Sequence, residues 1–103
     1  FRLGILNTRA GDYRAAATLF GDAIRFSNDR HPAGRNNLGV ILALMGRYRE
    51  AEREFEIALR QEDGSYEDAR LNLALCRSRL KPENLGQLAL TSATAPRRRL
   101  KGE

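Results

Sequence analysis

The chain has 103 residues, of which 42% are hydrophobic and 30% are charged, and its formal net charge is +5. This length suits one domain of ordinary size, and the composition allows a packed core and argues against global disorder. No apolar run approaches the roughly 20 residues that a membrane-spanning helix needs, and the first residues lack the basic-then-apolar pattern of a signal peptide. The chain begins at Phe1 rather than at Met, so we expect it to be a piece of a longer protein.

The positive charge is concentrated near the C-terminus. Residues 1–80 contain 13 arginines and 11 acidic residues, whereas residues 81–103 contain five basic and two acidic residues. The single cysteine, Cys76, excludes an internal disulfide framework and says little about cellular compartment. The compartment therefore stays open, with a cytoplasmic location favoured.

The spacing of apolar residues predicts five helices in chain order. In the second helix, for example, Ala16, Phe20 and Ala23 follow Tyr13 at spacings of three and four and so share one face. Pro32 suits the first turn of a helix, and a glycine such as Gly46 commonly ends one. The predicted helices cover about 1–10, 13–26, 32–45, 48–61 and 66–80.

A set of small, leucine and aromatic residues recurs after 35 positions. The first copy consists of Leu3, Gly4, Gly11, Tyr13, Ala16, Phe20 and Ala23, and the second of Leu38, Gly39, Gly46, Tyr48, Ala51, Phe55 and Ala58. A third copy begins at Leu73-Ala74 and then stops, because Lys81 stands where a turn glycine is expected. A fixed period of about 20 to 50 residues is typical of repeat arrays.

The repeated small residues predict close packing of helices. Gly4 and Gly39 each follow a leucine that we expect to point inward, and a side chain this small lets the second helix of a pair approach closely. The repeated alanines (Ala16, Ala23, Ala51, Ala58) act in the same way from the opposite helix. We expect Phe20 and Phe55 to fill the space between repeats, so that the helix pairs share one continuous core.

The repeated pattern Leu-Gly, six residues, Gly-x-Tyr-x-x-Ala-x-x-x-Phe-x-x-Ala resembles the tetratricopeptide repeat. One copy runs over 3–23 and another over 38–58, and a half copy is carried by 72–74. The period is 35 rather than the family's usual value of about 34, so we place one extra residue in the loop over 27–32.

This resemblance implies an all-α fold of antiparallel helix hairpins stacked in a right-handed superhelix, an α-solenoid of about two and a half repeats. The repeat domain would cover 1–80, in the segments 1–26, 32–61 and 66–80. Residues 81–103 would form a capping helix that holds Leu85, Leu88 and Leu90, a flexible tail with the basic cluster at 97–101, or both. The resemblance also implies a scaffold or adaptor whose concave face binds a peptide or another protein.

The first helix of each pair is expected to line the concave face. Reading positions i, i+4 and i+7 along that side gives Phe1, Ile5, Thr8, Asn36, Val40, Ala43, Leu71, Leu75 and Ser78. The groove is therefore predicted to be largely apolar, with Asn36 as a polar interruption, and would suit an amphipathic helix or an extended peptide with hydrophobic anchors. The alternative is that several of these side chains are half-buried against neighbouring helices and bind nothing.

One subset of the family grips C-terminal carboxylates with a basic clamp, which this sequence lacks. The corresponding positions hold Phe1, Ile5, Asn37, Asp68 and Asn72. Only Asn37 agrees with that clamp, and Asp68 would repel a carboxylate. We therefore reject carboxylate binding of this kind.

Two other functions are open to a chain of paired helices. Pentatricopeptide repeats, which bind RNA, share the 35-residue period, but the Leu-Gly pairs and the alanines at 23 and 58 favour the protein-binding relative. The nearly neutral body also lacks the basic stripe that phosphate contacts need. A structural or oligomerisation segment of a larger protein is the other alternative, because uncovered ends of so short a stack promote association, including a homo-oligomer.

Residues suited to catalysis or metal binding are sparse. His31 is the only histidine, and Cys76 lies 45 positions further on, so a Cys-His dyad would require the His31 loop to fold across the stack. Metal sites need several His, Cys or carboxylate groups at close spacing, which this sequence lacks. Gly34 and Gly39 have the spacing of two phosphate-loop glycines, but Val40 and Ile41 stand where such a loop needs Lys followed by Ser or Thr. We expect no enzyme activity, cofactor, metal ion or small-molecule substrate for this segment; a catalytic domain elsewhere in a longer chain stays open.

Overall fold

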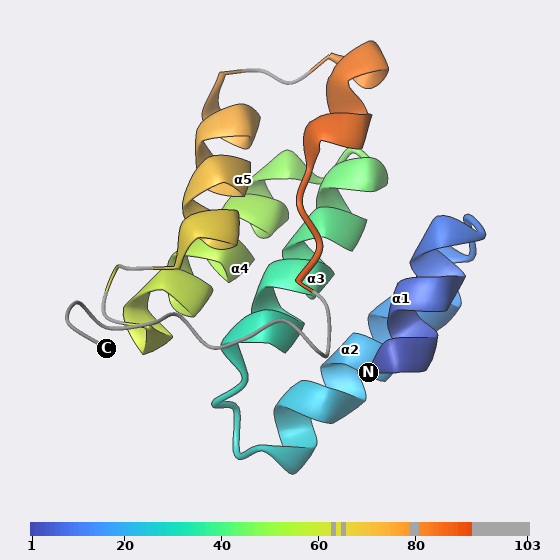
Figure 1. Cartoon of the computed structure of the whole chain (residues 1–103), viewed down its shortest axis with the longest axis vertical. Coiled ribbons are helices and arrows are strands. Elements are labelled where there is room, and N and C mark those ends of the chain that lie inside the picture. The colour runs from blue at the N-terminus through green and yellow to red at the C-terminus, as the bar shows by residue number, and fades with distance from the viewer. Residues whose placement is uncertain (63, 65, 79–80, 92–103) are drawn as a thin grey trace, which may run out of the picture.

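The computed structural model describes residues 1–62, 64, 66–78 and 81–91, and every regular element among these residues is a helix. Each α-helix packs against the next one along the chain (Figure 1). The all-α class predicted from the sequence is confirmed for this part of the chain. In order, the elements are α1 (Arg2–Arg9), α2 (Tyr13–Phe26), α3 (Pro32–Leu44), α4 (Tyr48–Gln61), α5 (Glu67–Arg77) and a 3-10 helix, η1 (Pro82–Gln87).

The turn after α1 and the turn after α3 have the same backbone structure. Gly11 and Gly46 lie in the left-handed region, with φ of 85° and 82°, which glycine adopts without steric cost. In both turns the next N–H closes the helix end: Asp12 donates to the carbonyl of Asn7 and Arg47 to that of Leu42, each at 2.8 Å. The 35-residue period of the sequence is therefore also a period of the backbone at these two turns.

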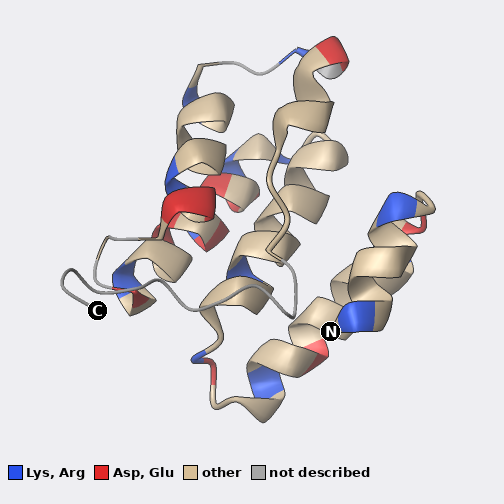
Figure 2. Ribbon diagram, viewed as in Figure 1, with Lys and Arg blue, Asp and Glu red and all other residues tan. Residues whose placement is uncertain are grey.

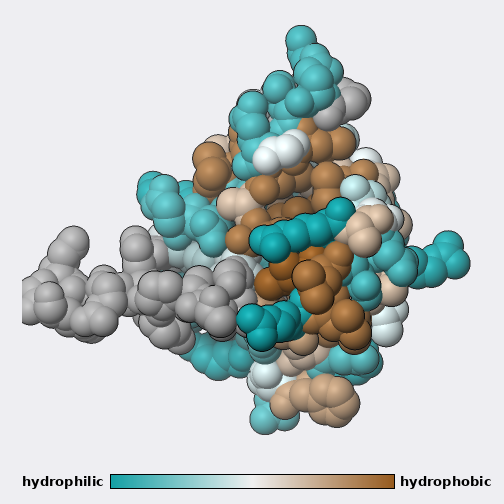
Figure 3. Space-filling view, turned by 45° about the vertical axis from the view of Figure 1, so that its right-hand side comes forward, coloured by the Kyte–Doolittle hydropathy of each residue, from teal (hydrophilic) through white to brown (hydrophobic). Residues whose placement is uncertain are grey.

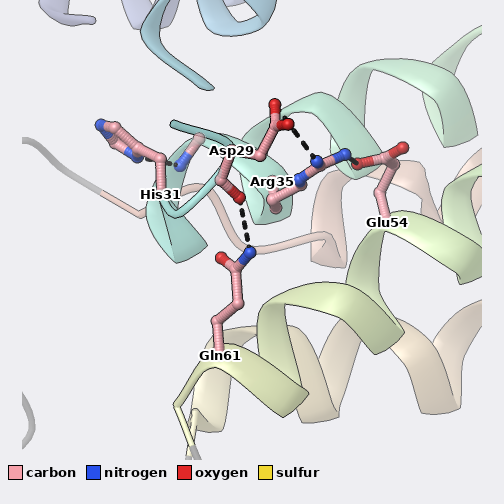
Figure 4. Close-up of polar contacts among 6 residues, drawn as sticks. Asp29, His31, Arg35, Glu54 and Gln61 are labelled. Atoms are coloured by element: carbon pink, nitrogen blue, oxygen red, sulfur yellow. Dashed lines mark hydrogen bonds and ion pairs between the residues drawn. The ribbon is translucent and has the colours of Figure 1, made fainter. Parts of the chain in front are cut away.

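The loop between α2 and α3 is fastened to α4. Asn28 and Asp29 both have positive φ, of 52° and 64°. The carbonyl of Asp29 accepts from Gln61 Nε2 at 2.7 Å, and the Arg35 guanidinium lies 3.0 Å from a carboxylate oxygen of Glu54 (Figure 4). These contacts connect the start of the second helix pair to the end of that pair.

The core consists of two buried clusters that share α3 as a wall. The first contains Ile5, Ala16, Phe20 and Ile41. The second contains Val40, Ala43, Ala51, Phe55, Ala58, Ala69, Leu73 and Cys76. Because neighbouring residues of α3 enter different clusters, this helix fixes the position of the first helix pair relative to α4 and α5.

The packing of glycine against phenylalanine occurs in both helix pairs. A Cβ atom added at Gly39 would lie 2.5 Å from Cε1 of Phe55, and one added at Gly4 would lie 2.8 Å from Cε1 of Phe20. The predicted close approach at Gly4 and Gly39 is therefore confirmed. Each phenylalanine, expected between repeats, lies against the glycine of its own pair; the cluster around Phe20 also includes Ile41 of the next pair.

One side chain that we expected to point inward, Leu3, is exposed. Leu3 is 56% exposed, whereas its equivalent Leu38 packs against the first cluster. The difference arises because a preceding helix pair covers Leu38, and no described helix precedes α1.

Figure 3 shows a face of the molecule on which apolar side chains gather near the centre.

The segment after α5 differs from the predicted helix of Leu85, Leu88 and Leu90. A 3-10 helix ends at Gln87, and Leu88 is extended, with φ −66° and ψ 135°. The basic cluster at 97–101 lies outside the described residues. No helix in the described part of the chain is long and apolar enough to cross a membrane.

A substitution at Gly39 tests the close packing of the second helix pair. Gly39→Ala should lower the free energy of unfolding by about 1–2 kcal/mol, because the clash with Phe55 outweighs the better helix propensity of alanine. Gly21→Ala is the matched control in α2, where the nearest atom to an added Cβ is 3.9 Å away; it should leave stability unchanged or raise it by up to about 1 kcal/mol. Urea denaturation measures both, and equal stabilisation of the two variants would contradict the packing.

Candidate functional site

An extended segment of the chain lies against α3 and α5. Residues 88–91, here named the strap, follow η1 and run along α3 (Figure 1). Side chains from both α3 and α5 form hydrogen bonds with the strap's main chain. The surface of α3 and α5 that the strap covers, here named the groove, is the candidate functional site.

Three buried asparagines form the floor of this groove: Asn36 and Asn37 on α3, and Asn72 on α5. Each is 0% exposed. A carboxamide has two N–H donors and one acceptor oxygen, and groups of this kind are hydrogen-bonded when they are buried. The contacts of these amides therefore define what the groove holds.

Two of the asparagines each bind both main-chain groups of one strap residue. Asn72 Oδ1 accepts from the N–H of Ala89 at 2.7 Å, and its Nδ2 donates to the Ala89 carbonyl at 2.8 Å. Asn37 Oδ1 accepts from the N–H of Thr91 at 2.7 Å, and its Nδ2 donates to the Thr91 carbonyl at 2.9 Å. Alternate residues of an extended chain are thus held along one edge, as a neighbouring β-strand would hold them.

The third asparagine joins the other two amides. Asn72 Nδ2 donates to Asn36 Oδ1 at 2.9 Å, and Asn36 Nδ2 lies 3.3 Å from Asn37 Oδ1. Asn36 Nδ2 also donates to the Ala89 carbonyl at 2.9 Å. The linked amides fix one another's orientation, so donors and acceptors face the strap in the required order.

The hydroxyl group of Thr91 lies among polar side chains of α3, α5 and the residue before α5. It donates to Asp68 Oδ2 at 2.8 Å and lies 3.3 Å from Asn36 Nδ2. It also forms a hydrogen bond with the hydroxyl of Tyr66. Because the single hydroxyl hydrogen of Thr91 is directed at Asp68, Tyr66 is the donor in this bond. Burial raises the pKa of the Tyr66 hydroxyl from 10.0 to about 12, so it keeps this proton at neutral pH.

The two leucines of the strap supply its apolar contacts. Leu88 and Leu90 both pack against the second cluster, and Leu90 also packs against the first. Leu90 therefore touches both halves of the core, and the strap is bound through apolar anchors as well as through its main chain.

The predicted groove residues are distributed unevenly around this site. Asn36 contacts the strap directly, and Val40 and Ala43 are buried in the second cluster, against which the strap packs. Ile5 is in the first cluster, and Leu75 is half-buried. Outside the strap's contacts, Phe1 stacks on His31 with ring centroids 5.3 Å apart, and Leu71 is 46% exposed.

The contacts of Asn37 and Asn72 with the strap were not predicted from the sequence, where these two residues stand at positions of the carboxylate clamp. A signal was present, because the two residues are 35 positions apart and each precedes a repeat leucine. Polar residues at equivalent positions of two repeats indicate a repeated hydrogen-bonding role. Asp68, whose charge would repel a carboxylate, instead accepts a hydrogen bond from the Thr91 hydroxyl.

The histidine and the cysteine occupy separate structural positions. His31 Nδ1 accepts from the N–H of Gly34 at 2.8 Å and so caps α3. Cys76 is buried in the second cluster, where burial raises the pKa of its thiol from 9.0 to about 11. Within the described residues, no group of three or more His, Cys, Asp or Glu side chains is placed to hold a metal ion.

Comparison of the chain with protein-family models, with curated protein sequences and with solved structures gives no match. The functional assignment therefore depends on the geometry of the groove.

Removal of the Asn72 amide tests the bonding of the groove. Asn72→Ala leaves the N–H of Ala89 and Asn36 Oδ1 without their partners, and the Ala89 carbonyl keeps only its contact with Asn36. We therefore expect a loss of about 2–4 kcal/mol in the free energy of unfolding. Asn84→Ala, which removes one exposed contact within η1, should change it by no more than about 0.5 kcal/mol. Chemical denaturation of both variants makes the comparison, and equal effects would show that the buried amide network is not formed.

The buried thiol gives a second prediction. At pH 8 a pKa of about 11 leaves roughly a hundredfold less thiolate than the ordinary value would. Cys76 should therefore react with iodoacetamide at least about a hundred times more slowly in the folded chain than in urea. The pKa of the Cys76 thiol is higher in the folded chain than in the unfolded chain. The buried thiol therefore contributes to the free energy of unfolding below pH about 9, and this contribution is lost as the pH rises towards 11. Equal alkylation rates in the two states would contradict this.

Proposed function

We propose that this chain is a protein-interaction module that binds an extended peptide segment of a partner protein in the groove between α3 and α5. The observation that supports the proposal is the pair of asparagines, Asn37 and Asn72, that each bind both main-chain groups of alternate strap residues. Main-chain hydrogen bonds provide affinity for extended peptides, and pockets for alternate side chains provide specificity.

The proposal includes the fold implied by the tetratricopeptide resemblance. In this interpretation α1 with α2 and α3 with α4 are successive repeats of a right-handed array, and α5 opens a third. Asn37 and Asn72 then occupy the same position in adjacent repeats, which explains why they bind residues of the strap that are two apart. The equivalent position of the first repeat holds Arg2, so the described groove has two such asparagines.

The distribution of charge favours a protein partner over RNA. Arg residues are interspersed with Asp and Glu residues along the helices (Figure 2). Arginines that lie within ion-pair distance of a carboxylate are Arg25, Arg35, Arg47, Arg70 and Arg77. Guanidinium groups that are already paired offer less to phosphates, whose binding depends on a concentrated positive surface.

Selection from a displayed peptide library tests the proposal. The baits are the full chain and its Leu90→Asp variant, in which an aspartate at the centre of the strap weakens occupancy of the groove by the strap. A full chain with both Asn37→Ala and Leu90→Asp serves as the counter-bait. We expect enriched peptides to lose at least about tenfold in affinity with the counter-bait, the equivalent of about 1.4 kcal/mol.

The salt dependence of binding separates the two partner classes. Affinity for the selected peptides should change little between 0.05 and 0.5 M salt, since the contacts are apolar and main-chain, whereas RNA binding falls steeply over such a range. The proposal would be overturned by the absence of any enriched peptide for both baits, or by enriched peptides that bind equally well without the Asn37 amide.

A further inference from the structure

We infer that the groove selects extended segments of the pattern Leu-x-Leu-Thr, and that the chain's own Leu88–Thr91 is an internal ligand that a partner segment of this pattern displaces. This inference rests on the proposed function and specifies both the partner and its competitor. The strap already makes the contacts that such a partner would make, so each position of the pattern can be derived from them.

The two leucine positions are set by packing. Leu88 and Leu90 alternate along the extended strap and both lie against the second cluster, with Leu90 also against the first. A charged residue at the Leu90 position would be desolvated between the two clusters with no partner, which is strongly unfavourable. The groove therefore requires apolar side chains at these alternate positions.

The intervening position is held through its main chain. The N–H of Ala89 donates to Asn72, and its carbonyl accepts from both Asn72 and Asn36. Every residue other than proline offers the same two groups. The pattern is therefore tolerant at this position and excludes proline there.

The fourth position requires a hydroxyl group. The Thr91 hydroxyl satisfies Asp68 as a donor and Tyr66 as an acceptor at the same time. Valine has the same shape as threonine but would leave the Asp68 carboxylate and the Tyr66 hydroxyl without a hydroxyl partner. Because unpaired buried polar groups are costly, the site should discriminate strongly against a peptide that lacks this hydroxyl. A phosphorylated threonine would place negative charge against Asp68 and would be rejected.

The way the strap is attached makes displacement possible. Among the described residues, the hydrogen bonds of 81–87 connect this segment only to itself and to Leu88, through pairs such as Asn84 with Lys81 and Gln87 with Asn84. Residues 81–87 therefore form a tether rather than an additional hydrogen-bonded anchor. The tether raises the effective concentration of the strap at the groove. The apparent affinity for a competing peptide is therefore the intrinsic affinity multiplied by the fraction of chains whose groove is open.

Peptide binding to the full chain tests the inference. The probe is a fluorescent peptide of residues 85–93, Leu-Gly-Gln-Leu-Ala-Leu-Thr-Ser-Ala, and circular dichroism checks that each variant is folded. We expect Leu90→Asp in the chain to tighten peptide binding at least about tenfold, because the internal competitor is weakened. Gln87→Asp adds the same charge at an exposed residue beside the strap and should leave the affinity unchanged.

Substitutions in the probe test the pattern. In binding to the Leu90→Asp chain, a peptide with valine in place of its threonine should lose at least about tenfold, and one with aspartate in place of its second leucine should lose more. Thr91→Glu in the chain is a second way to release the strap, since it sets a carboxylate against Asp68 and keeps both leucines. Equal peptide affinity for the unaltered chain and both release variants would overturn the inference.

Hydrogen exchange of the unaltered chain gives an independent test. A displaceable strap opens without global unfolding, so the amides of Ala89 and Thr91 should exchange at least about tenfold faster than that of Phe55 in α4. Exchange of all three at one rate would show that the strap is an integral part of the core. If library peptides bind in the groove but the 85–93 peptide does not, the inference fails while the proposed function stands.

Discussion

Much of the site depends on the burial of three uncharged amides that must all be hydrogen-bonded. Asn36, Asn37 and Asn72 are completely buried, and an unpaired amide in such surroundings would cost more than any single contact in the groove provides. They are satisfied partly by one another and partly by an extended main chain. An occupant of different backbone conformation would offer its N–H and carbonyl groups along different directions. The groove is therefore specific for extended chain before any side chain of the occupant is considered.

The position of these amides depends in turn on α3. This helix contributes Ile41 to one cluster and Val40 to the other, so the groove lies beside the element that both halves of the core share. The glycine of α3, Gly39, lies directly against the ring of Phe55, which brings α4 close behind α3. Because α3 is packed from both sides, its position fixes where its two asparagines meet the strap.

The sequence predicted the parts of this structure that are locally determined. The five α-helices, the glycine turns and the contact surfaces of Gly4 and Gly39 follow from periodicity and from the special properties of glycine, which operate within a few residues or within one helix pair. The exposure of Leu3 was not predicted, because a repeat position shows where a side chain points but not whether another helix covers it.

The strap and the asparagines escaped prediction for a different reason. The spacing of Leu85 and Leu88 suits a helix, yet the chain is extended from Leu88 because the amides of α3 and α5 bind its main chain. Such tertiary hydrogen bonds override local propensity, and they join residues 17 and 54 positions apart. The apolar pattern also predicted Leu71 as a groove residue, although Leu71 is exposed outside the strap's contacts. Asn37 and Asn72 determine what the groove holds, but from the sequence they were compared only with a clamp for a carboxylate.

The contact between the asparagine amides and the strap can be observed directly by nuclear Overhauser spectroscopy of the isotopically labelled full chain in solution. We expect cross-peaks from the side-chain amide protons of Asn72 to the main chain of Ala89, and from those of Asn37 to the main chain of Thr91, with extended-chain chemical shifts over 88–91. Random-coil shifts over 88–91 and no cross-peak to either asparagine would contradict this expectation.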